Sequence, residues 1–488
     1  MTIAVALRAE AVAVRRGSSA AVTRIGMRAP RADRALQGAG PLAMLGVAGG
    51  VAPHVQVGDV VVASEVRGDG ITVTCPAAPL LAGALRRAGL TVHVGPLATQ
   101  PRLARRDELA AMTMTGVLAV DMETAVVAGG AGARPFVAVR VISDNAAQPL
   151  MRPAIVRNGY RALRTLSRAA GVVEQWEAAI RPRSIRLASP RSFCAGVERA
   201  IDIVERALDR YGAPIFVRRQ IVHNAHIVAA LERRGAVFVE ELDEVPDGAR
   251  VIFAAHGVTP DVRTTADRRG LDVIDATCPL VAKVHNEVKR YAARDATVFL
   301  IGHADHEEVV GTVGEAADHV VVVEDEAAAA TVAAADPGNV AYVMQTTLAV
   351  DQADAIAGRL RQRFPSLVAP RSDDICYATS NRQAAVREIA TDSDLVLVVG
   401  SRNSSNSLRL VEVAQRAGAV AHLVDDATDV DLSWLRGVER IGITAGASAP
   451  PYLVDDLVHA LSALGPTDVH EVAAAEENVT FTLPREVS

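Results

Sequence analysis

The chain has 488 residues, half of them hydrophobic, with a net charge of −6, and this length suffices for two or more domains with cores of their own. No apolar run approaches the length that crosses a bilayer, so we expect a soluble protein without a membrane partner. Four scattered cysteines predict a reducing cytoplasm, and an aromatic content of 3% without a basic, aromatic-rich run argues against nucleic acid as a partner.

Charge is distributed unevenly along the chain, which predicts two modules. Residues 1–182 carry 21 arginines, no lysine and 12 acidic residues, a net charge of +9, so the remainder carries −15. A helical pattern from Tyr160 to about Ile180 is followed by Arg181-Pro182 and then by an apolar β run over residues 184–188. We therefore expect domains at 1–182 and 183–488. Both alternate β runs with helical stretches, as α/β folds do.

The first half has three motifs in chain order, "MLGVAGGV", "AVDMETAVVA" and "VRVISDNA". Together they resemble the nucleoside phosphorylase and nucleosidase superfamily. The resemblance implies an α/β domain in which Met122 and Glu123 hold ribose, Asp144 protonates a purine and Glu10 lies near the base. The alternative is a degenerate relative that only binds a ligand. Cys75, in "TVTCPAAP", has no partner in the sequence and is taken as incidental.

The second half places a cysteine before each of three helical patterns. Cys194 and Cys278 follow the β runs 184–188 and 271–274, and Cys376 lies in "SDDICYATSNRQAAVREIA". The cysteines are 84 and 98 residues apart, which suggests three related α/β units. A helix N-terminus favours the thiolate, so each position predicts an ionised sulfur.

Three interpretations of these thiols remain open from the residues alone. Free cysteines commonly fill small apolar spaces in a core. Three thiolates that meet on one axis suit a cubane iron–sulfur cluster with one iron free of protein ligands. A zinc site with three cysteines and one histidine is the competitor.

Polar side chains cluster in the loops between the cysteines. His223, His256 and His306 each follow a predicted strand, in "VHNAHIV", "AAHGV" and "GHADHEEVVG". Other polar residues precede apolar helical runs, and free N–H groups at a helix start bind phosphate. These residues are Thr346, Ser404, Ser405, Asn406 and Ser448. Glu308, in a histidine-bearing loop bounded by glycines, is the candidate proton donor.

From about Ser184 onward the chain resembles the 4-hydroxy-3-methylbut-2-enyl diphosphate reductase family of the non-mevalonate isoprenoid pathway. The matching motifs follow the family's order: "FCAGVERA", "VHNAHIV", "AAHGV", "DATCPLV", "GHADHEEVVGTVGE", "MQTTLAVDQ", "DDICYATSNRQ", "VVGSRNSSNS" and "ITAGASAP". The resemblance implies a trefoil of three α/β units around one 4Fe–4S cluster held by Cys194, Cys278 and Cys376.

The same resemblance implies roles for the polar residues. The diphosphate-binding positions fall on His223, His256, Ser404, Ser405, Asn406 and Ser448, with His306 and Thr346 near the substrate. Glu308 becomes the proton donor in a reductive removal of the allylic hydroxyl. The products are isopentenyl and dimethylallyl diphosphate, and the implied electron donor is a protein such as ferredoxin or flavodoxin.

Two other function classes compete with this reductase. One is a nucleoside phosphorylase or hydrolase whose C-terminal half only binds diphosphate ligands. The other is a zinc-bound protein without redox activity. Metal and sulfide analysis after anaerobic purification separates both from an iron–sulfur enzyme.

Overall fold

The structure is a computed structural model that describes residues 1–68, 70–145 and 155–488. The described chain divides into two compact units. Unit 1 comprises Met1–Ile185 with the later segments Asp425–Arg440 and Asp455–Val469, and unit 2 comprises Arg186–Val424, Ile441–Val454 and His470–Ser488. Two segments from late in the chain therefore group with the N-terminal half.

Unit 1 is built on an eight-stranded mixed sheet with the order β2-β1-β3-β7-β6-β4-β5. Strand β8 pairs with both β3 and β4, so β3, β7, β6, β4 and β8 form a closed ring of strands. The strands are β1 (Thr2–Val5), β2 (Ala21–Arg24), β3 (Leu42–Gly50), β4 (Val60–Gly68), β5 (Ile71–Thr74), β6 (Val92–Thr99), β7 (Ala119–Asp121) and β8 (Phe136–Asp144).

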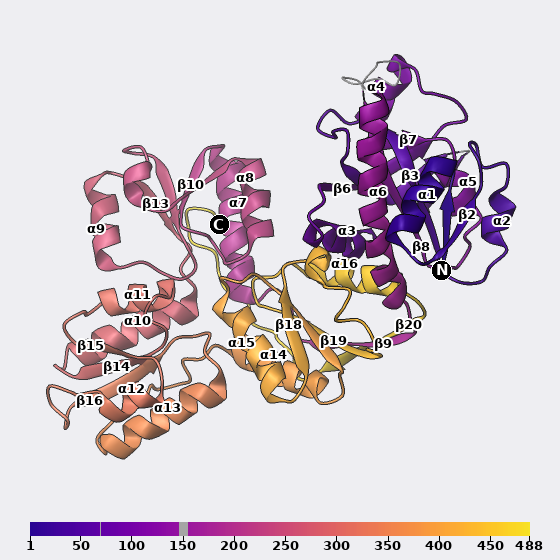
Figure 1. The fold of residues 1–488 in the computed structure, drawn as a ribbon. Helices are drawn as coiled ribbons and strands as arrows, with labels where there is room; N and C mark the ends of the chain where they lie inside the picture. The colour runs from indigo at the N-terminus through magenta and orange to yellow at the C-terminus, as the bar shows by residue number, and fades with distance from the viewer. Residues whose placement is uncertain (69, 146–154) are drawn as a thin grey trace. The chain divides into compact units, whose positions relative to one another are not determined.

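Helices surround this sheet (Figure 1). They are α1 (Arg8–Gly17), α2 (Ala32–Leu36), α3 (Ala78–Arg87), α4 (Arg106–Met114), α5 (Thr124–Gly129) and α6 (Ile155–Ala178). The long helix α6 begins earlier than the predicted start at Tyr160, and it packs against α1 and β8.

Unit 2 contains three separate sheets, as the three-unit prediction requires. The first has the order β11-β10-β12-β13 and the second β15-β14-β16, and all their strand pairs are parallel. The third, β18-β17-β19-β9-β20, includes the strand that opens the predicted second domain. Parallel strands are covered on both faces, which explains buried apolar runs such as "LVLVV" in β17 and "VFLI" in β14.

The elements of these sheets are as follows. The strands are β9 (Arg183–Ser189), β10 (Ile215–Arg218), β11 (Ala236–Val239), β12 (Arg250–Phe253), β13 (Asp272–Asp275), β14 (Thr297–Ile301), β15 (Val320–Val323), β16 (Val340–Met344), β17 (Leu395–Val399), β18 (Val420–Val424), β19 (Arg440–Ala445) and β20 (Thr467–Ala473). The α-helices are α7 (Ala195–Tyr211), α8 (Ala225–Arg234), α9 (Pro260–Arg268), α10 (Pro279–Ala292), α11 (Glu307–Gly314), α12 (Glu326–Thr331), α13 (Val350–Arg363), α14 (Tyr377–Ala390), α15 (Ser405–Arg416) and α16 (Pro451–Ser462). Two short 3₁₀ helices lie at Leu242–Glu244 and Ala427–Asp429.

Each cysteine helix packs on a different sheet. The buried side chains of α7 join the core of the first sheet, those of α10 the core of the second and those of α14 the core of the third. The strand β9 before Cys194 lies in the third sheet and β13 before Cys278 in the first, so at both cysteines the chain passes from one sheet to the next (Figure 1). The cysteines therefore lie where the α/β units meet.

The predicted repeat is only partly regular. Cys194 and Cys278 follow strands within a few residues, but no strand directly precedes Cys376, because residues 369–376 form turns and irregular backbone. That segment is rich in proline, serine and aspartate, which favour turns over strands. The mixed α/β fold class is confirmed.

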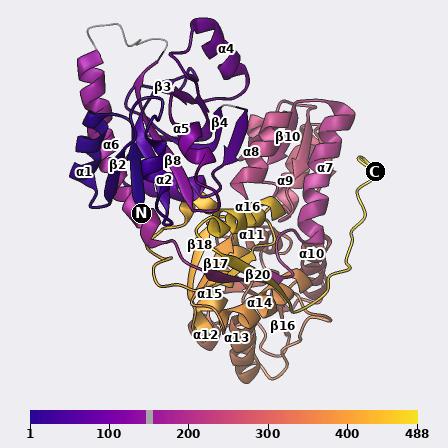
Figure 2. The same ribbon diagram turned by 90° about the vertical axis from the view of Figure 1, so that its right-hand side faces the viewer.

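The chain after β20 runs as an extended segment, drawn in yellow in Figure 2. Arg199 and Tyr211 of α7 donate to the carbonyl oxygens of Thr482 and Glu486, at 2.8 and 2.6 Å. Val487 is buried in the core of the first sheet. The C-terminal residues are thus tied to unit 2.

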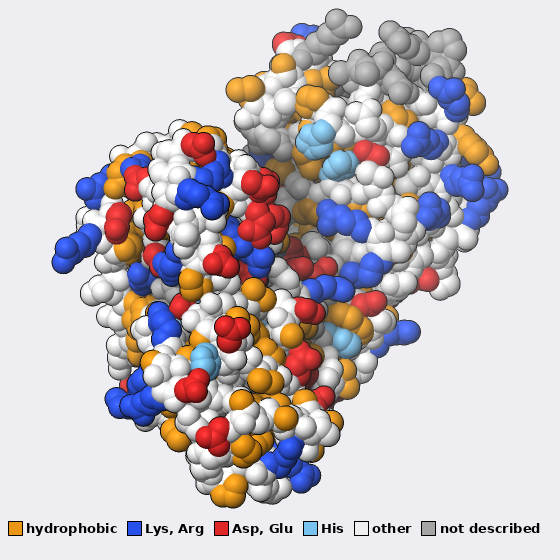
Figure 3. Space-filling view, turned by 90° about the vertical axis from the view of Figure 1, so that its left-hand side faces the viewer, with side chains coloured by type: hydrophobic (Ala, Val, Ile, Leu, Met, Phe, Trp, Pro, Cys, Tyr) orange, Lys and Arg blue, Asp and Glu red, His pale blue; other side chains and the backbone are white. Residues whose placement is uncertain are grey.

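The surface charge follows the asymmetry of the sequence. On the face seen in Figure 3, the part of unit 1 around the grey residues has blue basic side chains and few red acidic ones. Basic and acidic side chains are interspersed over unit 2. The basic residues of unit 1 are scattered in this view and do not gather into one patch.

Candidate functional site

One cavity in unit 2, of about 110 Å³, gathers all the site residues predicted in the second half of the sequence. They come from loops and helix starts of all three α/β units. These residues are Cys194, His223, His256, Cys278, His306, Glu308, Thr346, Cys376, Ser404, Ser405, Asn406 and Ser448.

The three cysteines occupy equivalent positions in the backbone. Cys194, Cys278 and Cys376 are the N-cap residues of α7, α10 and α14, and all three are free. A side chain at Gly196 would place its Cβ 2.8 Å from the sulfur of Cys278 and 3.8 Å from that of Cys194. Two of the sulfurs therefore approach the same point, and the glycine leaves room for them.

Cys278 and Cys376 do not ionise as readily as their helix positions predict, which corrects our expectation for these two thiols. Burial raises the pKa of Cys278 to about 11 and that of Cys376 to about 12, and the nearby thiols raise both further. Backbone N–H groups at the helix starts lower these pKa values but do not outweigh burial. Buried sulfurs of this kind become thiolates only beside a cation, and an iron–sulfur cluster or a zinc ion supplies one.

Glu308 is a buried acid in this cavity. Its side chain is 2% exposed and accepts hydrogen bonds from Thr346, from the backbone N–H at 2.6 Å and from Oγ1 at 2.9 Å. Burial raises the pKa of Glu308, and the bonds from Thr346 oppose this only in part. The carboxyl group is thus set to hold a proton at higher pH than an exposed glutamate.

Three histidine rings lie together on another wall. The rings of His223 and His256 are stacked with centroids 4.1 Å apart, and His306 meets both edge-on at 5.9 and 6.0 Å. Burial, with the nearby His256, lowers the pKa of His223 to about 3 and that of His306 to about 4. These two rings are neutral at neutral pH, so each has an N–H donor and a free lone pair.

Hydroxyl and amide groups form the remaining polar wall. Ser404 caps α15, and the hydroxyl of Ser448 donates to the carbonyl oxygen of His223 at 3.0 Å. Asn406 is 5% exposed, yet neither its amide nitrogen nor its amide oxygen has a hydrogen-bond partner among the described residues. A buried amide without partners costs free energy, which a polar ligand in the cavity removes.

In unit 1, two of the predicted residues meet one buried arginine. Glu10 accepts hydrogen bonds from the backbone N–H groups of Ala6, Leu7 and Val47 at 2.9, 2.7 and 2.8 Å. Glu123 lies 3.8 Å from the guanidinium of Arg140. Burial raises the pKa of Glu10 and of Glu123, and Arg140 partly offsets it.

Gly46 fits between two members of this cluster. A Cβ atom at this position would collide with the side chains of both Arg140 and Glu10. Position 46 therefore has no room for any side chain, and only glycine fits there. The structure therefore brings Glu10 and Glu123 together through Arg140, as parts of one buried charge cluster.

The other two residues predicted in the first half are less enclosed. Asp144 ends β8, is half-buried and accepts a hydrogen bond from the hydroxyl of Ser143 at 2.8 Å, while burial raises its pKa. Met122 is half-buried beside Glu123. Cys75 is buried, and burial raises its pKa to about 12, which fits an unreactive thiol.

Sequence reasoning missed several residues of the cavity. Thr379 donates to the sulfur of Cys376 from its backbone N–H, at 3.3 Å, and Phe481 lines the cavity from the C-terminal segment. Gln345 does not line the cavity but donates to two residues that do, Thr347 and Ser405, at 2.8 and 3.4 Å. Thr379 could have been found, because it stands three residues after an N-cap. Phe481 gave no local signal.

The comparisons with known proteins assign families to both halves. Residues 185–462 match the family described as LytB protein. The 4-hydroxy-3-methylbut-2-enyl diphosphate reductase of Mycolicibacterium paratuberculosis is 56% identical over 306 residues, which cover 62% of this chain and 92% of that protein. The solved structure of the E-1-hydroxy-2-methyl-but-2-enyl-4-diphosphate reductase from Plasmodium falciparum is 38% identical, with a TM-score of 0.60, and covers 63% of this chain and 97% of that one.

Residues 10–174 match the Phosphorylase superfamily. A 5'-methylthioadenosine/S-adenosylhomocysteine nucleosidase from Neisseria meningitidis is 19% identical, with a TM-score of 0.31, and covers 36% of this chain and 98% of that one. The superfamily match, not this overlap, supports the assignment of the first half. Among the described residues, no helix is both long and apolar enough to cross a membrane.

Proposed function

Because the chain belongs to the LytB family, we propose that it is a 4-hydroxy-3-methylbut-2-enyl diphosphate reductase with an additional N-terminal domain of the Phosphorylase superfamily. The observation that carries the proposal is one cavity lined by three free cysteines, a buried carboxyl group and the amide of Asn406, which has no hydrogen-bond partner among the described residues. We place the domain boundary at residues 182 and 183, between the two matched ranges.

We assign to this cavity one 4Fe–4S cluster held by Cys194, Cys278 and Cys376. The donor set supports it, because three free thiols at three helix starts would offer a cluster three ligands and leave one iron for substrate. The bound cluster supplies single electrons and a Lewis-acidic iron. The competing assignment is a zinc ion with three cysteine ligands and one histidine ligand. It would use for the metal a histidine ring that the diphosphate needs.

The polar wall binds the diphosphate group in this proposal. His223 and His256 stand on one side, and Ser404, Ser405, Asn406 and Ser448 on the other. Asn406 and the hydroxyl groups donate to phosphate oxygens, and the start of α15 adds free backbone N–H groups. These contacts lie away from the carbon that reacts, so their binding energy orients the allylic end toward the cysteines.

Glu308 supplies the proton that leaves with the hydroxyl group as water. Its raised pKa favours the protonated carboxyl group, and Thr346 fixes its orientation through two hydrogen bonds. The reaction consumes two electrons and two protons, breaks the allylic C–O bond and releases water with isopentenyl or dimethylallyl diphosphate. A small redox protein such as ferredoxin or flavodoxin delivers the electrons, and the free cysteines fit a reducing cytoplasm.

The test is reduction of 4-hydroxy-3-methylbut-2-enyl diphosphate by anaerobically purified protein with a chemical reductant. We expect both diphosphate products, with substrate consumption proportional to iron content. A protein that binds the substrate without reducing it, or that holds zinc, contradicts the proposal.

For the N-terminal domain we propose nucleoside binding, with Met122 and Glu123 at the ribose, Glu10 near the base side and Asp144 at the base. The superfamily match and the buried cluster around Arg140 support it. Purine nucleosides are the probes, with binding and release of free base measured separately. Asp144→Asn should keep binding and abolish release of the base. Absence of binding by the full chain would leave the domain without this function.

A further inference from the structure

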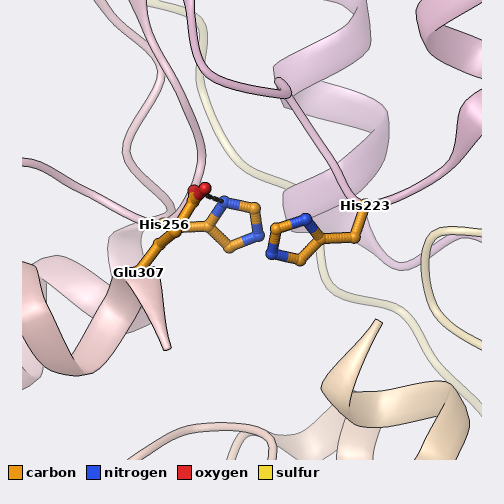
Figure 4. Close-up of side chains that lie close together, drawn as sticks. All are labelled: His223, His256 and Glu307. Atoms are coloured by element: carbon orange, nitrogen blue, oxygen red, sulfur yellow. Dashed lines mark ion pairs between the residues drawn. The ribbon is translucent and has the colours of Figure 1, made fainter. Parts of the chain in front are cut away.

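Glu307 lies beside the histidine wall and contacts one of its rings. Its carboxylate is 3.2 Å from Nδ1 of His256, and the second ring nitrogen of His256 points toward His223 (Figure 4). Glu307 is the first residue of α11 and lies between His306 and Glu308. Both neighbours have predicted roles in the site, but Glu307 has none. Its side chain is partly buried, so the contact is shielded from solvent.

Arg219 holds Glu307 from the other side. Its guanidinium lies 3.7 Å from Glu307 and 3.2 Å from Glu241. Arg219 has a φ of 58°, in the left-handed region that non-glycine residues rarely adopt. Backbone strain of this kind persists where surrounding structure fixes the residue and is common near functional sites. The strained turn after β10 thus directs the guanidinium group of Arg219 at the carboxylate of Glu307, which faces His256.

We propose that Glu307 is a positioning residue that fixes the ring of His256 and, through its negative charge, makes this ring the one that pairs with the diphosphate group. This inference rests on the proposed function and deepens it. A carboxylate at Nδ1 keeps a proton on that nitrogen, so His256 can offer a donor from its other nitrogen only as the imidazolium ion. The neighbouring rings cannot take this role, because His223 and His306 are held neutral.

The charges around His256 agree with this assignment. Burial opposes ionisation of Glu307, but the contact with His256 and the nearby Arg219 lower its pKa to about 2, so the carboxylate is charged. The stacked His223 ring lies on one side and His306 on another. The charged carboxylate of Glu307 thus faces Nδ1 of His256 beside two neutral rings, where a diphosphate adds negative charge.

A divalent ion is the alternative occupant of the same place. One ligand atom each from His223, His256 and Glu307 lies within 4.8 Å of the others. Within the described parts of the chain, Nδ1 of His256 makes no hydrogen bond of normal geometry. Arg219 argues against it, because its charge would repel a cation bound to Glu307. The observations therefore favour an ion pair.

The experiment measures binding of inorganic diphosphate to the anaerobic holoenzyme by calorimetry, together with steady-state kinetics. Glu307→Gln should raise the Kd for diphosphate and the KM about tenfold, as expected for loss of one charge-assisted contact, with kcat within about twofold. Glu307→Asp should recover part of the loss. In a His256→Asn background, Glu307→Gln should have no further effect, because the imidazole ring that Glu307 contacts is gone.

Glu326→Gln is the matched control, since Glu326 also begins a helix and pairs with an arginine but is exposed and outside the cavity. It should leave the Kd and KM unchanged. Additive effects of the Glu307 and His256 substitutions, or a fall in kcat alone, would overturn the inference. Stoichiometric zinc uptake beyond the cluster, lost in Glu307→Gln, would overturn it in favour of a metal site. Failure of the unsubstituted protein to bind diphosphate would instead count against the proposed function.

Discussion

Two requirements conflict at Cys278. Burial raises the pKa of its thiol to about 11, but a cluster ligand must be a thiolate. In the proposed assignment the positive charge of iron would resolve the conflict, because the sulfur would ionise as it coordinates. Cys278→Ser should remove that ligand, because a hydroxyl group is a poor substitute for thiolate. We expect loss of most iron and sulfide and of all turnover, measured by metal analysis and assay.

Cys75→Ser is the control for this substitution, because Cys75 lies in the core of unit 1 and lines no part of the cavity. It should retain iron content and activity. A normal cluster and normal activity in Cys278→Ser would refute the three-cysteine assignment.

At Glu308 the prediction concerns both rate and pH. Burial raises the pKa of this carboxyl, and the protonated form is the one that donates. The rate of the unsubstituted protein should therefore hold at low pH and fall as the pH rises through that raised pKa. Glu308→Gln keeps the shape but has no acidic proton, so kcat should fall by ~10²–10⁴-fold.

The pH profile of kcat under single-turnover conditions checks this prediction. In the Gln variant the alkaline limb that belongs to Glu308 should disappear. A variant with unchanged kcat would move the proton donor to another group of the cavity, with His306 next to consider.

At the scale of elements, the start of α7 determines whether the sulfurs can meet. Gly196 lies in its first turn, and a Cβ there would stand 2.8 Å from the sulfur of Cys278. Gly196→Ala should therefore displace a ligand and lower iron content severalfold, while circular dichroism stays near that of the unsubstituted protein. Alanine favours the helix over glycine by about 1 kcal/mol, but this gain should not restore the cluster.

Gly358→Ala provides the matched helix control. Gly358 lies within α13, and an added Cβ would meet no atom within 4 Å. Iron content should be unchanged and thermal stability should rise slightly. Equal iron content in both alanine variants would show that the close approach at Gly196 does not limit assembly.

Much of the site could be predicted because it is local in sequence. A cysteine before an apolar helical pattern marks an N-cap, and the buried residues Val281, Val284, Val288 and Tyr291 of α10 recur at the helical spacing that is visible in the sequence. Contacts between distant segments could not be predicted in this way. The pairing of β9 with β19 depends on strands that are far apart in the chain. The same holds for the contact of Arg219 with Glu307.

At the scale of the whole molecule, the proposed two-domain organisation predicts that the C-terminal part works alone. A protein beginning at Arg181 retains all of β9, all three cysteines and every proposed diphosphate contact. We expect it to assemble the cluster and to reduce the substrate at a rate close to that of the full chain. Iron content and kcat of the two proteins check this prediction.

Stability of the shortened protein should nonetheless be lower. Residues 425–440 and 455–469 group with the N-terminal residues, and Arg87 donates to the carbonyl oxygen of Thr428 at 3.0 Å. Removing those partners exposes surface, so the melting temperature should fall. An insoluble or inactive shortened protein would make the first domain a structural part of the reductase.

The central claim is that three free thiols hold a redox cluster in the diphosphate cavity. The most direct test is iron and sulfide analysis of the anaerobically purified full chain, with the reductase assay run on the same sample. We predict about four iron and four sulfide per chain and formation of isopentenyl and dimethylallyl diphosphate. Zinc in place of iron, or a full cluster without reduction of the substrate, would contradict the account.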